Sequence, residues 1–201
     1  MQIFKTFQKR KLKKNNYWQR CIMIPEKDYV FNPEKHPQKH GVVIFLVNEL
    51  GCILYGEQLV NNGRGSRGDL SLIGESRDTS GSREFLLMKA LKEEIGSDNV
   101  RSVLMPDNLR TAWLGSVTFL TGVNAQVYCL KWIGGSQVPV RINSNGSISD
   151  DDFMALGWIS LEDLQNIEVG GKSMRRGMQN VIWAVLSNER AVERVLAISK
   201  L

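Results

Sequence analysis

The pattern of apolar and polar positions predicts several strands between residues 42 and 159. The apolar run 42–47, the polar turn 48–51 and the apolar run 52–55 predict a β-hairpin. A short strand is expected at 70–73, ending at Gly74. Further strands are expected near 112–121, 126–133 and 155–159.

Two segments have helical spacing instead. Residues 82–95 predict a helix that Ser80 or Ser82 caps and Gly96 ends, with Leu87, Met88, Leu91 and Ile95 on its core face. The segment 173–199 predicts an amphipathic helix with a break near Asn188. Together these elements indicate an α+β fold, a mixed β-sheet with a packed C-terminal helix.

Charge divides the chain in two. Seven of the 26 basic residues lie in 1–20, which contains no acidic residue. The segment 21–201 contains the other 19 basic residues and all 21 acidic residues. We therefore expect a basic N-terminal arm, 1–40, partly packed on a domain that spans 41–201. The arm has three interpretations: a disordered tail, a packing element, or a contact to RNA or nucleotide phosphates.

Composition excludes several classes of protein. The three cysteines are far apart in the sequence, and no two of them form a CxxC motif. This argues against a disulfide framework and against a zinc site built from cysteines. No apolar run reaches the roughly 18 residues of a membrane-spanning helix. The basic start is unlike a secretory signal, so a cytoplasmic location without a membrane partner is expected.

The end of the helix 82–95 carries the most informative chemistry. Glu93 and Glu94 are adjacent carboxylates in the last turn, where they repel one another and the helix dipole. We expect them on either side of a strip of Leu86 and Ala90 that is separate from the core face. A divalent cation such as Mg²⁺ would reverse this cost, because it binds carboxylate oxygens and leaves positions open for phosphate. Alternatively, this is a solvated acidic helix end with Lys89 and Lys92 as partners.

The layout of these elements resembles the Nudix hydrolase family. The similarity runs from about 41 to 164 and includes the hairpin, a short strand ending in glycine, a helix closing in EExG, and the late strand and turn 157–164. The family signature reads G, five residues, E, seven residues, then REUxEExGU, where U is a bulky aliphatic residue. The resemblance implies a Nudix-like mixed β-sheet sandwiched between helices.

The chain departs from this signature at four positions. Lys89 stands for the arginine, Ala90 for the first glutamate of REUxEE, and Ser97 for the last aliphatic residue. The upstream glutamate falls on Gly81. In the family, water attacks a phosphoanhydride and a carboxylate orients or deprotonates that water. Because Ala90 has no carboxylate, the resemblance implies that a hydrolase of this kind takes it from another part of the chain.

The resemblance also implies roles for individual residues. Glu93 and Glu94 would bind Mg²⁺ or Mn²⁺ and act in catalysis, and Gly74 would contribute its carbonyl to the metal, although it stands one residue before the position that the signature spacing gives. The acidic run 150–152 would supply a further catalytic carboxylate, with Asp151 as the candidate, unless that run is a solvated loop. Glu57 and Glu75 are weaker candidates. Arg64 and Arg67 would reach a substrate phosphate, or else lie in a mobile glycine-rich loop.

Two functions follow from these expectations. The first is a Nudix-type, Mg²⁺-dependent pyrophosphatase that cleaves the pyrophosphate linkage of a nucleoside diphosphate derivative. The second is a catalytically degenerate Nudix-fold protein that binds a nucleotide or RNA and has a regulatory role. A resemblance by accident, on another α+β scaffold, is the third alternative, and a homodimer is left open.

Overall fold

A mixed sheet forms the centre of the molecule in the computed structural model, which describes residues 29–32, 41–59, 68–75, 82–119, 124–141 and 153–201. Within these residues the main sheet has nine strands, with the order β1-β7-β8-β2-β3-β4, and with β5, β6 and β9 paired to β2, β8 and β3. The strands of this sheet are β1 (Tyr29–Asn32), β2 (Gly41–Val47), β3 (Cys52–Gln58), β4 (Leu70–Ser71), β5 (Ile73–Glu75), β6 (Val103–Leu104), β7 (Trp113–Phe119), β8 (Asn124–Trp132) and β9 (Phe153–Ser160). A separate hairpin consists of β10 (Glu168–Val169) and β11 (Lys172–Ser173).

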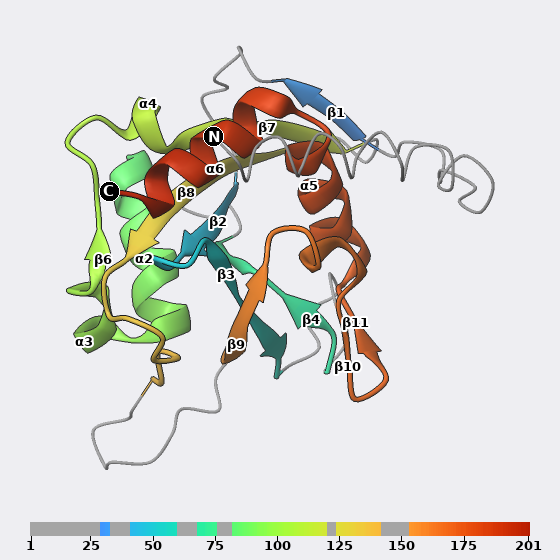
Figure 1. Ribbon diagram of the computed structural model, residues 1–201, viewed down its shortest axis with the longest axis horizontal. Coiled ribbons are helices and arrows are strands. Elements are labelled where there is room, and N and C mark those ends of the chain that lie inside the picture. The colour runs from blue at the N-terminus through green and yellow to red at the C-terminus, as the bar shows by residue number, and fades with distance from the viewer. Residues whose placement is uncertain (1–28, 33–40, 60–67, 76–81, 120–123, 142–152) are drawn as a thin grey trace.

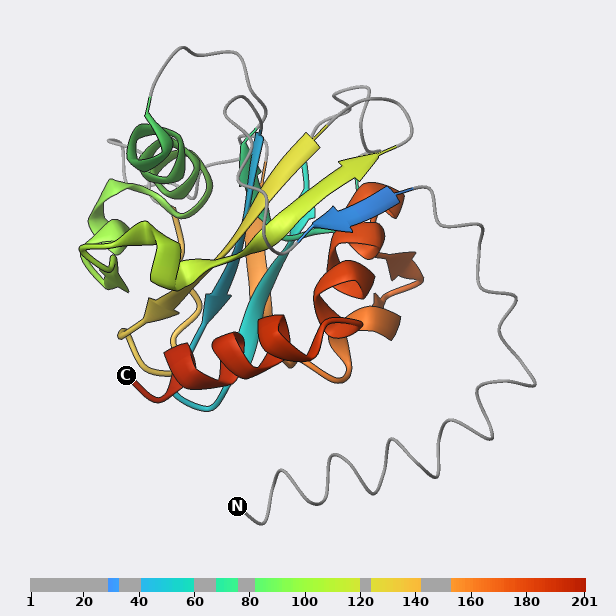
Figure 2. The same cartoon turned by 90° about the horizontal axis from the view of Figure 1, so that it is seen from above.

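Helices cover both faces of this sheet (Figure 1). They are α2 (Arg83–Ile95), α3 (Ser97–Val100), α4 (Leu109–Ala112), α5 (Arg176–Leu186) and α6 (Glu189–Ser199), with the 3₁₀ turn η1 (Leu164–Asn166). Figure 2 shows α2 on one side of the sheet and α5 with α6 on the other. The expected fold class, an α+β fold with a mixed sheet between helices, is confirmed.

The predicted hairpin forms as β2 and β3. Its turn is held by Asn48, whose Oδ1 accepts hydrogen bonds from the backbone N–H groups of Leu50 and Cys52, both at 3.0 Å. Gly51 has a φ of +77°, which a residue with a side chain rarely adopts. β2 is buried along almost its whole length because strands pair along both of its edges and the helices α2 and α6 pack over its faces.

The predicted break in the C-terminal helix is also confirmed. α5 ends at Leu186, and Asn188 begins α6 by accepting a hydrogen bond at its Oδ1 from the N–H of Ala191, at 3.0 Å. Met178 and Ile182 of α5 and Val195 of α6 are buried against the sheet. This pair of helices therefore closes one face of the core.

The edge of the sheet includes part of the region that the sequence assigns to the arm. β1 pairs antiparallel with β7, from Tyr29 opposite Phe119 to Asn32 opposite Ser116. The residues 1–28 and 33–40 lie outside the described part of the chain, so the boundary between arm and domain stays a prediction. Among the described residues, no helix has both the length and the apolar character that crossing a membrane requires.

Candidate functional site

α2 begins and ends where the sequence predicts, and its last turn carries the two candidate glutamates. Ser82 caps its start, because its Oγ accepts a hydrogen bond from the N–H of Phe85 at 3.3 Å. Gly96 ends it with a φ of +84° and donates its N–H to the carbonyl oxygen of Lys92. Glu93 and Glu94 therefore occupy the position at the end of a helix that the EExG pattern indicates.

Basic and polar groups from outside α2 stabilise this acidic helix end. The guanidinium of Arg141 donates a hydrogen bond to the backbone carbonyl of Glu93, and the amide of Asn99 donates to the carbonyl of Ile95 at 2.7 Å. A positive charge at a helix C-terminus offsets the dipole there. The fold thus compensates part of the cost of two adjacent acids in the last turn.

A third carboxylate, Glu75 of β5, faces α2. Side chains alternate between the two faces of a strand. A Cβ added to Gly74 would lie 3.2 Å from Met178 of α5, whereas Glu75 reaches Lys89 of α2, with 3.2 Å between Nζ and Oε2. The same Nζ lies 3.7 Å from Oε2 of Glu93. The Lys89 ammonium therefore lies between a carboxylate of the strand and a carboxylate of the helix.

The charges of this group perturb one another. The pKa of Glu93 is raised, first by partial burial, then by hydrogen bonding to Glu75 and by its like charge, with Lys89 acting in the opposite direction. Burial acts to lower the pKa of Lys89, but its attraction to Glu75 and Glu93 outweighs burial and raises it. The fold thus holds two carboxylates together across α2 and β5.

Ala90 corrects one expectation about this helix. The sequence places Leu86 and Ala90 on a strip separate from the core face, between the two glutamates, but both are buried, with 6% and 0% of their surface exposed. Met88, expected in the core, is only partly buried. α2 packs against β2, β5 and β9, and this wide contact buries more of the helix than its strongest apolar positions indicate.

Gly74 has a structural reason to be glycine. An added Cβ would lie 3.1 Å from the carbonyl oxygen of Val42, which is too close for an ordinary contact. The strand does not end at Gly74 as expected. β5 continues to Glu75, because Val42, Val43 and Ile44 of β2 pair with all three of its residues. The role of Gly74 as a metal ligand stays a prediction.

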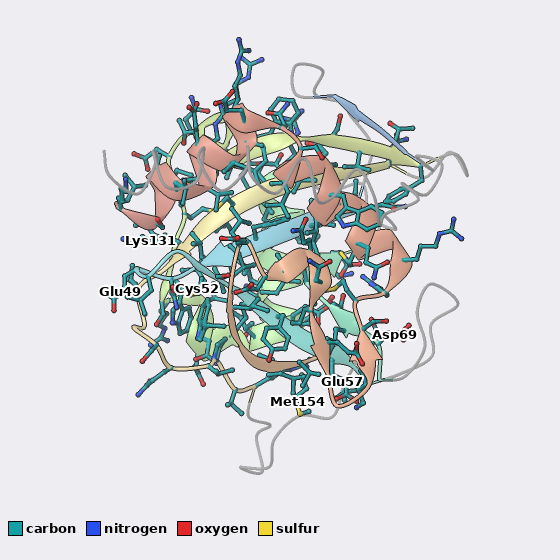
Figure 3. The ribbon with its side chains drawn as sticks, turned by 45° about the vertical axis from the view of Figure 1, so that its right-hand side comes forward. Glu49, Cys52, Glu57, Asp69, Lys131 and Met154 are labelled. Carbon is teal, nitrogen blue, oxygen red and sulfur yellow. The ribbon has the colours of Figure 1, made fainter. Side chains whose placement is uncertain are left out.

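Glu57 takes part in a different contact. Its Oε1 accepts a hydrogen bond from Nζ of Lys172 in β11, at 2.6 Å. Figure 3 shows Glu57 close to Asp69 and Met154, at the end of β3 opposite the turn that carries Glu49. This ion pair attaches the hairpin of β10 and β11 to the sheet, so Glu57 has a structural partner away from α2.

Several predicted site residues lie outside the described part of the chain. They are Arg64 and Arg67, the aspartates 150–152 with Asp151, and the basic residues of 1–28. Their assigned roles stay predictions.

The described residues fit a magnesium ion in one specific way. They contain no group of three or more His, Cys, Asp or Glu residues that could hold a metal ion. Mg²⁺, however, commonly binds one or two carboxylates and completes its coordination with water and substrate phosphates. The Glu75–Glu93 pair meets this smaller requirement. Glu94 follows Glu93 in α2, and its Oε2 atom is buried.

The structure brings Glu75, the weaker candidate, next to Lys89 and Glu93. The signal that points to it is the alternation of β5, since Ile73 lies in the core and Glu75, two residues later, shares its face. That face packs against α2, which brings Glu75 to Lys89 and Glu93.

Comparison with known proteins gives similarity of structure only. No protein-family model matches the chain, and no curated protein matches it. A MutT protein from Methanosarcina mazei is 18% identical over 84% of this chain and 99% of that one, with a TM-score of 0.45. A pyrophosphohydrolase from Bacillus subtilis is 13% identical over 84% and 90%, with a TM-score of 0.47. A Nudix hydrolase from Nitrosomonas europaea is 11% identical over 80% and 90%, with a TM-score of 0.45.

Proposed function

We propose that the chain is a Nudix-type pyrophosphohydrolase that uses Mg²⁺ or Mn²⁺ and acts on a nucleoside diphosphate derivative. One observation carries the proposal: Glu93, in the last turn of α2, is held against Glu75 of β5 although both are acids. The two carboxylates share the single ammonium group of Lys89, and perturbed carboxylates of this kind are frequent in functional sites.

We assign the following roles to these residues in the proposed reaction. Glu93 and Glu94 would hold the cation, with Gly74 as the proposed carbonyl ligand, and the cation would neutralise negative charge on the pyrophosphate. Water attacks one phosphorus. The bond from that phosphorus to the bridging oxygen breaks, two phosphate monoesters form, and a carboxylate takes a proton from the water. Because Ala90 has no oxygen, Asp151 is the proposed proton acceptor.

Metal binding is tested by melting temperature. A ligand that binds only the folded state stabilises it by mass action, so millimolar Mn²⁺ should raise the melting temperature. Glu94→Gln should remove the rise. Glu193→Gln is the matched control, because Glu193 is exposed on α6, on the opposite side of the sheet. No rise in the wild type would refute the metal site.

Turnover is tested on a panel of nucleoside diphosphate derivatives, including ADP-ribose, by chromatography of the nucleoside monophosphate released. Alanine at all three aspartates of 150–152 should reduce turnover by about 10²- to 10⁴-fold, the usual contribution of general acid–base catalysis. Undiminished turnover in this triple variant would contradict the assignment of Asp151.

A second candidate is a protein of the same layout that binds a nucleotide or RNA without cleaving it. Two observations favour it: Ala90 is fully buried and has no carboxylate, and Lys89 already offsets the charge of Glu75 and Glu93. This candidate predicts binding of one compound of the panel, measured by calorimetry, with no product at any Mn²⁺ concentration. A wild type that neither binds nor cleaves any compound of the panel would refute both candidates.

A further inference from the structure

We infer that Lys89 is the resident counter-ion of the Glu75–Glu93 pair and that a divalent cation binds there only by displacing its ammonium group. The inference deepens the proposed function and rests on it. It assigns Glu75, which lies outside the EExG motif, to the cation site, and it gives Lys89 a part in setting the metal affinity.

The distances place Lys89 in competition with a metal ion. Its Nζ lies 3.2 Å from Oε2 of Glu75 and 3.7 Å from Oε2 of Glu93, so it is close to the two carboxylates that a cation would share. A divalent cation and an ammonium group repel one another at such short range. Loading the metal therefore requires the ammonium to leave.

The surroundings allow it to leave. The Lys89 side chain is 29% exposed, whereas Glu75 is 13% exposed and held in β5. A lysine has a flexible four-carbon stem and a strongly hydrated head, so it can turn into solvent while its Cα stays in the helix. The carboxylates stay in place and the lysine moves.

The chain provides a matched pair of lysines for the test. Lys89 and Lys92 are on the same helix, about one turn apart, and Lys92 is exposed. Among the described residues, the ion pair to Glu75 is made by Lys89. Lys89→Met and Lys92→Met remove the same charge and leave side chains of similar length. Any difference between them reports the position of the ammonium and not the net charge.

We expect Lys89→Met to bind Mn²⁺ about tenfold more tightly than the wild type, measured by calorimetry or by the electron paramagnetic resonance signal of unbound Mn²⁺. A neighbouring opposite charge changes the proton affinity of a carboxylate by about 10- to 1000-fold, and partial exposure favours the lower limit. Lys92→Met should change the Mn²⁺ affinity by less than about threefold, as expected for a screened surface charge. Lys89→Arg, which keeps the charge, should retain the wild-type affinity, and Glu75→Gln should weaken it.

The outcomes separate the two claims. If Mn²⁺ binds but Lys89→Met and Lys92→Met have the same affinity, the inference is wrong and the proposed hydrolase stands. If neither the wild type nor Lys89→Met binds Mn²⁺, both fail. Far-ultraviolet circular dichroism confirms folding of each variant. If Lys89→Met does not fold, Lys89→Gln is compared with Lys92→Gln, and equal affinities overturn the inference in the same way.

Discussion

Replacing Ala90 by glutamate tests the packing of α2 most directly. The substitution puts a carboxylate where the resembled signature has one, but Ala90 has no exposed surface and faces the core. The variant therefore measures whether the helix could accept the missing glutamate. The exposed position Lys92, on the same helix, is the control.

The expected cost has two parts. Adding volume to a packed core costs about 1–3 kcal/mol, and an unpaired buried charge costs about 3–5 kcal/mol. We expect Ala90→Glu to lower the free energy of unfolding by roughly 4 kcal/mol or more at pH 7. Lys92→Glu, which adds an acid to the same last turn, should cost only about 0.3–1 kcal/mol.

Urea unfolding followed by tryptophan fluorescence measures both variants. Burial would raise the pKa of the new carboxyl group, so the folded state would bind its proton more tightly than the unfolded state. Ala90→Glu should therefore regain stability relative to the wild type as the pH falls from 7 to 5. A loss below about 1 kcal/mol at pH 7, well under the packing and charge costs, would refute the burial argument. The variant should then be assayed for new metal-dependent cleavage.

Three further predictions concern the same helix and its partners. Leu91→Ala should cost about 2–5 kcal/mol in urea unfolding, because Leu91 is fully buried; a loss below half a kilocalorie would mean that α2 packs differently. Gly96→Ala should cost about 1–3 kcal/mol, because a φ of +84° strains any residue with a Cβ and the side chain of Arg141 lies 3.2 Å from that Cβ. Glu75→Gln should lower the pKa of Glu93, measured by NMR titration of labelled carboxyl groups, because it removes a like charge. A carboxyl group with a raised pKa stabilises the folded state at low pH, and this contribution is lost as the pH rises through that pKa. Glu75→Gln should therefore reduce the decrease in the free energy of unfolding that ionisation of Glu93 causes between pH 4 and 7. An unchanged Glu93 titration would show that the two carboxylates do not interact.

Local signals were sufficient for most of the secondary structure. Ser82 and Gly96 define α2, and Asn188 defines the break between α5 and α6, because each of these residues acts through hydrogen bonds to its own neighbours in the chain. The hairpin turn at Asn48 is local in the same way.

The site depends on contacts that no local signal describes. Whether Ala90 lies in a site or in the core depends on what packs over the helix, and β2, β5 and β9 do so from different parts of the chain. The meeting of Glu75 with Glu93 likewise needs the position of β5 relative to α2. Periodicity gives the face of each element but not its partner.

The parallel pairing of β2 with β8 at the centre of the sheet has a consequence for how the chain folds. Along one edge, residues 41–47 pair with 124–132, which follow only after the hairpin, α2 and β7 have been synthesised. Contacts between distant segments require the closure of a long loop before they contribute any stability, and such topologies fold slowly. On a ribosome, the apolar strand β2 would emerge well before β8 and remain exposed on that edge, so this stage of synthesis is where we expect the chain to be most prone to aggregation and most dependent on chaperones.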